Sequence, residues 1–567
     1  MQAVDPIKVA LRRCQTAFWM AFALGFFVNG LLLAVSIYSM QVFDRVLSSG
    51  SIETLFALSL IVFVALVFMA VFQWLRGAIL ARCGSWMESQ LGVPTAQSVL
   101  SMAVRVPELG AQPLRDLASI RGFLVSPALV AALDAPWAVI FLGVLFLISP
   151  LLGWFLTGCA IVLAVIALVG DWLTKTSSEE AGDRKILALQ AIEGMVANAE
   201  VIRSMGFASG ALERWRQHET EAGRLSERAG ASALVSGTIV KAARLLVQCA
   251  ITGVAAWLVI KGDLSAGAII AATMLAAKVL TPIDALSSIH QALQQARKAH
   301  GRLKRLEAAI ARDGAPESFG MPDPTGQISL VNLSYRLPDS ERWILRGVTA
   351  SIAPGEAVGV VGPSGIGKST LLRLIAGVVP PTAGTVRFDG ADRQYWAPEA
   401  LGACVGYLPQ HVELLAGTVA ENIARFTREA SDEAVILAAR FSRVHDLIVA
   451  LPSGYTTDVG HTGRHLSAGQ RQRVGLARAF FGSVRIVLLD EPNAHLDSAG
   501  EDALVRVIRD AKGKGITTVT AVHRLSILAE MDKVFLFTGD GYRFGPPHEV
   551  LPRPAGSVRT LAQARVP

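Results

Sequence analysis

The chain has 567 residues, of which 52% are hydrophobic and 17% are charged, and its formal net charge is +7. A chain of this length exceeds what one hydrophobic core usually supports, so we expect at least two domains. The five cysteines are scattered and form no CxxC pair, which supports neither a disulfide framework nor a cysteine-based metal site.

The shortage of charge points to a membrane. Soluble domains carry roughly 25% charged residues, and the deficit here is concentrated in the first half of the chain. Membrane insertion is the simplest explanation. The positive net charge then reflects Lys and Arg held on the cytoplasmic side of the membrane, so we expect no nucleic acid as a partner.

Six apolar stretches in the first half approach the ~20 residues that a helix needs to cross a bilayer. They are Trp19–Met40, Leu55–Leu75, Ala128–Ile148, Leu151–Leu173, Leu245–Ile260 and Ala266–Val279. The last two are short, and each stretch could also be a buried helix of a soluble domain. Six in one half, with the third and fourth joined only by Ser149 and Pro150, favour an all-α six-helix transmembrane domain over residues 1–312.

Basic residues predict the orientation of these helices. Three of them precede the first span: Lys8, Arg12 and Arg13. The long connections 76–121 and 175–241 are also rich in basic residues, whereas the connections at 44–45, 149–150 and 261–263 are short. We therefore expect the N-terminus and the long connections in the cytoplasm. A cleaved signal peptide is not expected, because the first apolar run is too long and lacks a small-residue cleavage site.

Four ionisable residues lie within or near the spans: Asp134, Asp171, Arg244 and Lys278. Charge at membrane depth is costly and indicates a cavity or pathway by default, while the competing interpretation is a side chain that reaches out at a helix end. We favour the second interpretation for Asp171. Arg244 and Lys278 could equally line a polar passage for polypeptide, because Lys241 and Gln248 share a helix face with Arg244.

A linker follows the membrane domain. A helical pattern continues from Ile283 to about Ala311, and the breaks at Gly314–Pro316 and Pro322–Pro324 then interrupt it. We assign residues 313–327 to the linker and residues 328–567 to a second domain.

The second domain contains a glycine-rich loop. It consists of Gly362, Pro363, Ser364, Gly365, Ile366, Gly367, Lys368, Ser369 and Thr370. Such a loop alone could be an ordinary turn, but a predicted strand at Ala357–Val361 precedes it and a predicted helix at Leu371–Ile375 follows it. Backbone N–H groups of the loop would surround phosphate oxygens, Lys368 would contact the outer phosphates, and the Ser369 hydroxyl would bind magnesium. The sequence therefore predicts an α/β P-loop nucleotide-binding domain that takes ATP and Mg2+.

A second strand carries the acidic residues that phosphoryl chemistry needs. The run Ile486–Leu489 is apolar and ends at Asp490 and Glu491. We expect Asp490 in the coordination shell of the metal and Glu491 beside the attacking water.

Between these motifs lies Leu466-Ser467-Ala468-Gly469-Gln470. This order resembles the nucleotide-binding domain of ATP-binding-cassette proteins. The resemblance implies that Ser467, Ala468, Gly469 and Gln470, at the start of a helix, bind the γ-phosphate of an ATP held by the phosphate loop of another chain. One chain carries one membrane half and one ATPase domain, so a homodimer is the economical expectation.

The resemblance implies further roles. Tyr335 would stack on adenine, although a core tyrosine is nearly as good an interpretation. Gln410 would sense the magnesium and the attacking water, and Asp497 would lie in a loop that communicates across the dimer. His523 would hold the γ-phosphate. Catalysis would then rest on Glu491, His523 and Gln410, and metal binding on Ser369, Gln410 and Asp490.

Three positions depart from the usual pattern. Ala468 replaces the first glycine of the signature, and Ile366 stands where a smaller residue is common. His461 stands where exporters often carry a glutamate that helps coupling, which puts that contact in doubt.

The membrane half is similar to a narrower group, the type I secretion exporters for proteases and repeat-in-toxin proteins. The matching stretches are Tyr38–Val46, Pro113–Leu117, Leu133–Trp137, Asn198–Gly206 and Leu280–Asp284. This resemblance implies an inner-membrane protein in contact with membrane lipid, a periplasmic adaptor, an outer-membrane channel, and an unfolded protein substrate with an uncleaved C-terminal signal. Segments near Arg105–Gly110 and Gly206–Arg214 would dock on the ATPase domains.

Two alternatives remain open. A homodimeric exporter of lipids, peptides or drugs would share this architecture, and a soluble cassette ATPase would lack the six spans. An N-terminal peptidase domain is not expected, because little sequence precedes Trp19.

Overall fold

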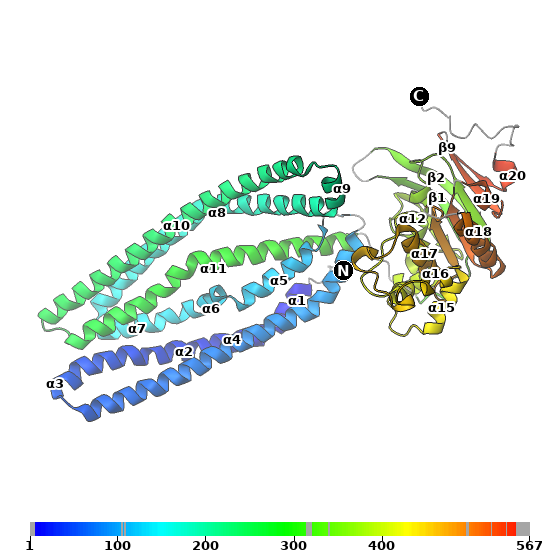
Figure 1. Ribbon diagram of the computed structural model, residues 1–567. Coiled ribbons are helices and arrows are strands. Elements are labelled where there is room, and N and C mark those ends of the chain that lie inside the picture. The colour runs from blue at the N-terminus through cyan, green and yellow to red at the C-terminus, as the bar shows by residue number, and fades with distance from the viewer. Residues whose placement is uncertain are drawn as a thin grey trace. The chain divides into compact units, whose positions relative to one another are not determined.

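A computed structural model describes residues 6–103, 106, 109–312, 320–337, 341–494, 498–522, 524–539 and 541–551. The chain divides into two compact units, residues 1–313 and 314–567 (Figure 1).

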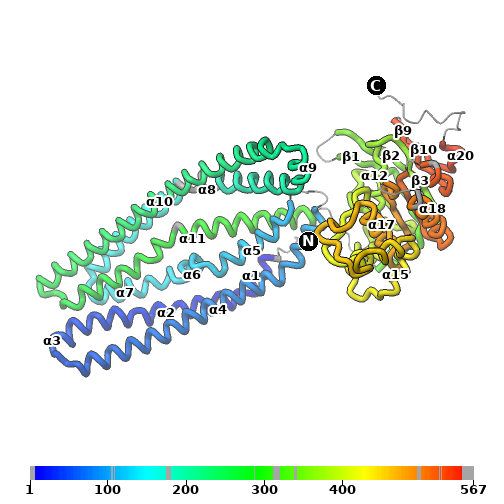
Figure 2. The backbone as a smooth tube through the Cα atoms, in the orientation of Figure 1, coloured from blue at the N-terminus to red at the C-terminus, as the bar shows by residue number. Residues whose placement is uncertain are grey.

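The first unit is built from helices. They are α1 (Pro6–Arg13), α2 (Gln15–Gln41), the π-helix η1 (Val42–Val46), α3 (Leu47–Ser49), α4 (Ile52–Ala103), α5 (Gln112–Val125), α6 (Pro127–Asp134), the 3-10 turn η3 (Ala135–Trp137), α7 (Ala138–Ile148), α8 (Pro150–Ala197), α9 (Ala199–Ser204), α10 (Ala208–Ile260) and α11 (Ala266–Arg312). Figure 2 shows α8 and α10 running side by side and joined at α9.

Six segments of the described residues are long and apolar enough to cross a membrane. They are Gln15–Ser49, Ile52–Ala103, Pro127–Ile148, Pro150–Leu173, Ala208–Ile260 and Ala266–Ile310. Each contains one of the predicted spans, so the prediction of an all-α six-helix membrane domain is confirmed. The helices are longer than the apolar patterns suggest: the 52 residues of α4 extend about 78 Å at 1.5 Å per residue, well beyond a hydrocarbon core of about 30 Å.

An ion pair between a buried arginine and a half-buried aspartate joins α4 to α6 beside α2. Arg76 of α4 is 2% exposed, and its Nη1 lies 2.6 Å from Oδ1 of Asp134 on α6. Asn29 of α2 donates its amide to the same carboxylate oxygen at 3.1 Å. Gly25 allows this approach, since a Cβ there would lie 3.1 Å from the Asp134 carboxylate. Asp134, predicted to mark a cavity or a helix end, instead joins three helices.

The other ionisable residues of the spans also have defined places. Asp171 of α8 pairs with His290 of α11, and Arg244 of α10 pairs with Asp284 of α11. Lys278 is exposed on α11. We expected the Asp171 side chain to reach out at a helix end, whereas in the structure it contacts a second helix. The polypeptide passage along Arg244 and Lys278 stays a prediction.

Further acidic residues contact α11 at its two ends. At its start, Asp44 of η1 accepts hydrogen bonds from the Gly267 backbone N–H at 2.7 Å and from the Ser265 hydroxyl at 2.5 Å. Near its end, Asp116 of α5 is 2% exposed and receives both Nε and Nη2 of Arg302, at 2.8 and 2.6 Å. These contacts fix α11 against η1 and α5.

The described residues of the second unit form two sheets. Its strands are β1 (Ile328–Arg336), β2 (Trp343–Ile352), β3 (Ala357–Val361), β4 (Ala383–Phe388), β5 (Ala391–Asp392), β6 (Val405–Leu408), β7 (Ile486–Asp490), β8 (Thr517–Ala521), β9 (Lys533–Thr538) and β10 (Gly541–Gly545). One sheet has the order β2-β1-β4-β5 and is antiparallel; the other has the order β10-β9-β3-β8-β7-β6 and is parallel except for β10.

Helices surround these sheets. The described α-helices are α12 (Lys368–Ala376), α13 (Pro398–Cys404), α14 (Val419–Ile423), α15 (Asp432–Phe441), α16 (His445–Val449), α17 (Ala468–Ala479), α18 (Ser498–Gly513), α19 (Leu525–Leu528) and α20 (Pro547–Val550). The predicted strands before the glycine-rich loop and before Asp490 are β3 and β7. Both pair with β8 in parallel, so their carboxyl ends lie at the same edge of the sheet.

Replacing Asp134 by alanine would leave Arg76 as a buried charge without this carboxylate. Breaking a buried pair from one side costs about 3–5 kcal/mol, so we expect a large loss of thermal stability for Asp134→Ala in detergent or nanodiscs. Asp263→Asn, on an exposed turn, is the control and should unfold like the wild type. A wild-type melting temperature for Asp134→Ala would show that the pair does not hold these helices together.

Candidate functional site

The glycine-rich loop connects β3 to α12 through backbone that favours glycine. Gly365 and Gly367 have φ angles of +78° and +113°. A Cβ at Gly367 would also lie 2.9 Å from Cγ2 of Ile344 and 3.0 Å from Cδ2 of Leu345, both on β2. The loop therefore passes close to β2 and returns to start α12 at Lys368.

Lys368 closes this loop on itself. Its Nζ donates to the carbonyl oxygens of Gly362 at 2.9 Å and Pro363 at 3.0 Å, and the residue is 5% exposed. Burial lowers the pKa of Lys368, while the nearby carboxylates of Glu491 and Asp490 oppose that shift. The ammonium group is thus held at the centre of the loop, where the phosphates of a nucleotide would lie.

Ser369 and Asp490 meet beside Lys368. The Ser369 hydroxyl donates to Oδ1 of Asp490 at 3.0 Å, and Asp490 is 1% exposed. Its other oxygen, Oδ2, is buried and has no hydrogen-bond partner among the described residues. Burial raises the pKa of the Asp490 carboxyl, and the hydrogen bond from Ser369 opposes this shift. Mg2+ prefers oxygen ligands such as a carboxylate and a hydroxyl, and phosphates and water complete its coordination shell. Asp490, with one buried oxygen not hydrogen-bonded among the described residues, and Ser369 therefore fit magnesium.

Glu491 follows in a strained turn. Its φ angle is +48°, a conformation that costs a non-glycine residue of the order of 1–3 kcal/mol. Gln410, just after β6, donates its amide to Oε2 of Glu491 at 3.1 Å. Strain at this position, held by the surrounding structure, is typical of a residue that must present its carboxylate in one direction.

Gln472 of α17 holds the same turn, and sequence reasoning missed it. Its side chain is buried, and its amide donates to the carbonyl oxygens of Glu491 at 3.2 Å and Pro492 at 2.9 Å. The available signal was weak: a glutamine in a helix, two positions after Gln470. The structure therefore connects the helix of the signature directly to the acidic turn.

The signature itself caps α17. Ser467 accepts a hydrogen bond from the Gln470 backbone N–H at 3.2 Å, and Gln470 Oε1 accepts one from the Ser467 N–H at 2.8 Å. This capping box leaves Ser467 and Ala468 exposed, with Gly469 half-buried. The N-terminus of a helix favours an anion.

The remaining predicted residues are placed as follows. Tyr335 is half-buried on β1, packs against the core of this unit and pairs in register with Leu345, which lies beside Gly367. Ile366 also packs against this core, and His461 is exposed in a short 3-10 turn. Asp497 and His523 lie outside the described residues, and so do positions 105, 107 and 108 of the first predicted docking segment and 313–319 of the linker.

Two family models match the chain. The ABC transporter model matches residues 345–494, and the ABC transporter transmembrane region matches residues 18–283. The type I secretion system ATP-binding protein PrsD of Rhizobium meliloti (strain 1021) is 37% identical over 554 residues, which cover 96% of this chain and 94% of that protein. The chain belongs to the ABC transporter family.

Other relatives point the same way. The leukotoxin translocation ATP-binding protein LktB of Mannheimia glucosida is 28% identical, and the leukotoxin export ATP-binding protein LtxB of Aggregatibacter actinomycetemcomitans is 29% identical. Each alignment covers 95% of this chain and 77% of the relative. The structure of a bacterial Atm1-family ABC exporter with ATP bound matches the fold with a TM-score of 0.81 at 22% identity, over 95% of this chain and 96% of that one.

These comparisons confirm the resemblance to type I secretion exporters and the α/β nucleotide-binding domain. As an ABC transporter, the protein binds nucleotide and crosses the membrane several times. The soluble cassette ATPase is therefore the wrong alternative.

Asp490 carries a stability cost that a neutral isostere should remove. Burial disfavours its ionised form in the folded state, so at pH 7 the carboxylate destabilises the nucleotide-free protein. We expect Asp490→Asn to raise the stability of that state by about 0.5–2 kcal/mol while ATP turnover with Mg2+ falls sharply. Thermal unfolding without nucleotide measures the first effect, with Asp502→Asn on exposed α18 as control. A melting temperature below wild type would contradict the burial argument.

Proposed function

We propose that the protein is an ATP-driven half-transporter that exports unfolded proteins with a C-terminal signal as part of a type I secretion system. The full-length similarity to PrsD at 37% identity carries this proposal, since it spans the membrane half as well as the ATPase. The leukotoxin exporters support it, because their names state protein cargo. ATP hydrolysis is coupled to this transport.

The residues of the site divide the chemistry among them. Lys368 and the loop N–H groups hold the phosphates, and Gly365 and Gly367 let the loop backbone come close to them. Bound at Ser369 and Asp490, with Gln410 beside them, Mg2+ would supply charge neutralisation for the developing transition state. Glu491, directed by Gln410 and fixed by Gln472, orients and polarises the attacking water. By resemblance, His523 holds the γ-phosphate, Asp497 communicates between subunits, and Tyr335 stacks on adenine.

The signature supports a homodimer. Ser467 and Ala468 are exposed at the start of α17, where backbone N–H groups can donate hydrogen bonds to the phosphate oxygens of an ATP held by a second chain. Two copies would clamp two ATP molecules between the loop of one chain and the signature of the other. Closure of this pair would pull the membrane halves from an inward to an outward state, and hydrolysis would reset them.

The proposed location is the cell inner membrane. The basic residues ahead of the first span and in the long connections support a cytoplasmic N-terminus and a cytoplasmic ATPase domain. A periplasmic adaptor and an outer-membrane channel would complete the export path, and membrane lipid would surround the spans.

Glu491→Gln tests the ATPase mechanism. The amide retains the size of the carboxylate and can still accept the hydrogen bond from Gln410, so the fold should persist. Loss of the base should lower ATP turnover by about 10²–10⁴-fold, while nucleotide still drives dimer closure. Turnover and ATP-dependent crosslinking report the two effects. Glu549→Gln, exposed on α20, is the matched control. Hydrolysis at the wild-type rate in Glu491→Gln would remove Glu491 from this role.

Deleting the exporter and comparing secreted proteins tests the cargo. We expect one or more proteins to vanish from the medium, to remain in the cell, and to return when the wild-type chain but not Glu491→Gln is restored. A fusion of their C-terminal segment to a passenger protein should be exported. An unchanged set of secreted proteins together with altered lipid, peptide or drug export would contradict protein secretion and favour the homodimeric exporter of lipids, peptides or drugs.

A further inference from the structure

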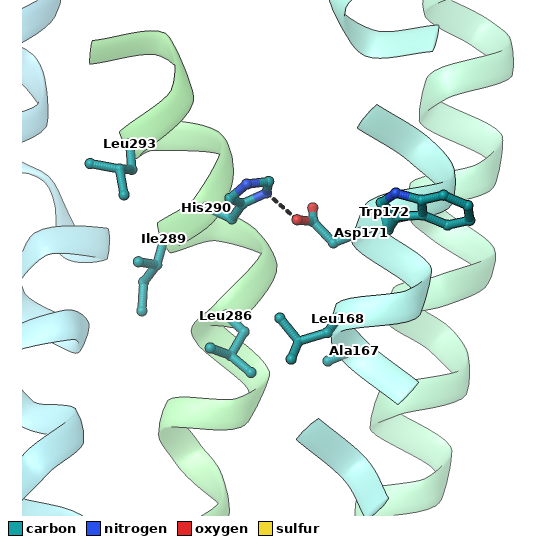
Figure 3. Close-up of a pocket in the computed structure, with 8 residues that line it drawn as sticks. All are labelled: Ala167, Leu168, Asp171, Trp172, Leu286, Ile289, His290 and Leu293. Carbon is teal, nitrogen blue, oxygen red and sulfur yellow. Dashed lines mark ion pairs between the residues drawn. The ribbon is translucent and has the colours of Figure 1, made fainter. Parts of the chain in front are cut away.

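A pocket of about 390 Å³ lies between α8 and α11. Figure 3 shows Asp171 of α8 and His290 of α11 facing each other across it, joined by their ion pair. Apolar side chains from both helices form much of the remaining lining: Ala167, Leu168, Leu286 and Ile289. The pocket thus combines one polar contact with an apolar wall.

Apolar side chains lie on both sides of the ion pair. Leu168 precedes Asp171 by three residues and Leu286 precedes His290 by four, so each leucine lies about one helical turn before the polar residue of its own helix. In Figure 3 both leucines lie on one side of the ion pair, and Leu293, three residues after His290, lies on the other. The ion pair is therefore a polar point within a mostly apolar lining.

The ion pair lies at the end of a membrane span. The apolar run of the sequence in α8 ends at Leu173, just before Lys175, so Asp171 and Trp172 lie in its last turn. Trp172 is 73% exposed and also lines the pocket. An exposed tryptophan at the end of a span is typical of the level where hydrocarbon meets lipid headgroups.

The ion pair supplies a carboxylate that accepts hydrogen bonds. Asp171 offers a carboxylate with two oxygens, of which Oδ2 faces His290 Nδ1, while His290 Nε2 lies 3.0 Å from the Gln294 amide. The side chains of Asp171 and His290 are 12% and 36% exposed, so the pair is reachable from the pocket. A carboxylate in this position attracts a cation and repels an anion.

We propose that this pocket binds the headgroup of a phospholipid with a primary ammonium group, as in phosphatidylethanolamine. The ammonium contacts the Asp171 carboxylate, and the first carbons of a chain lie along Leu168 and Leu286. The volume takes a headgroup and the start of a chain, and the rest of the lipid stays in the bilayer. With the proposed cytoplasmic orientation this lipid comes from the inner leaflet and lies in the pocket between α8 and α11.

The test uses the full-length chain in nanodiscs of phosphatidylcholine with a trace of phosphatidylethanolamine that carries a photoactivatable diazirine close to its headgroup. We expect crosslinks within residues 165–173 and 286–294. Asp171→Asn should lower this labelling at least five-fold. Glu180→Gln, exposed further along α8, is the matched control and should label like the wild type.

A second variant separates binding from folding. Leu286→Trp fills the apolar part and leaves Asp171 and His290 in place, so it should also lose the label while its melting temperature stays close to wild type. A phosphatidylglycerol probe, which is anionic, should label less than the phosphatidylethanolamine probe. Equal labelling by both probes, or full labelling of Asp171→Asn, would overturn the proposal.

The outcome is independent of the cargo. Absence of lipid labelling in the wild-type chain, when that chain hydrolyses ATP and restores secretion, refutes only the lipid site. Specific labelling of a chain whose deletion leaves secreted proteins unchanged refutes only the export proposal.

Discussion

The membrane unit depends on one constraint, that a charge held among apolar helices needs a partner. Its carboxylates meet this constraint by reaching other helices: Asp134 joins α6 to α4, and Asp284 joins α11 to α10. Association of helices in lipid has little hydrophobic driving force, so polar contacts and small residues decide which helices meet. Gly25 and Gly170 are such small residues: a Cβ at Gly170, for example, would lie 1.9 Å from the Ser236 hydroxyl of α10, so only glycine allows the two helices to come this close.

In the ATPase unit, too, a buried charge needs a partner, but here part of that partner is the ligand. Here a carboxylate oxygen of Asp490 stays buried without a hydrogen-bond partner among the described residues, and Glu491 holds a strained backbone. Both features cost stability, and both become useful when magnesium and phosphate arrive, because the groups are then already in position. The membrane unit pairs its charges with other residues of the chain, whereas in the ATPase site Oδ2 of Asp490 is left to bind the metal.

Local motifs were predictable from the sequence, and long-range pairings were not. The glycine-rich loop and the apolar run before Asp490 each lie within ten residues, so the local sequence placed the loop between a strand and a helix and identified the run as a strand. Six spans followed from composition. The partner of Asp171 is 119 positions away on another helix. Gln472 contacts the turn at Glu491 only because the fold packs α17 beside the end of β7. Such contacts depend on packing, which a single sequence does not reveal.

The positions of these contacts define which helices can move together. α8 and α10 approach closely at Gly170 and Ser236, so they form one pair. Two ion pairs tie that pair to α11, Asp171 with His290 and Arg244 with Asp284, and the hydroxyls of Thr252 on α10 and Thr273 on α11 form a hydrogen bond. α11 is also held by Asp44 at its start and by Asp116 near its end. A movement of the α8–α10 pair away from α11 must therefore break the two ion pairs, while the contacts of α11 with η1 and α5 can remain. The lipid pocket lies at one of those two ion pairs, so a headgroup that contacts Asp171 would act where the helices separate.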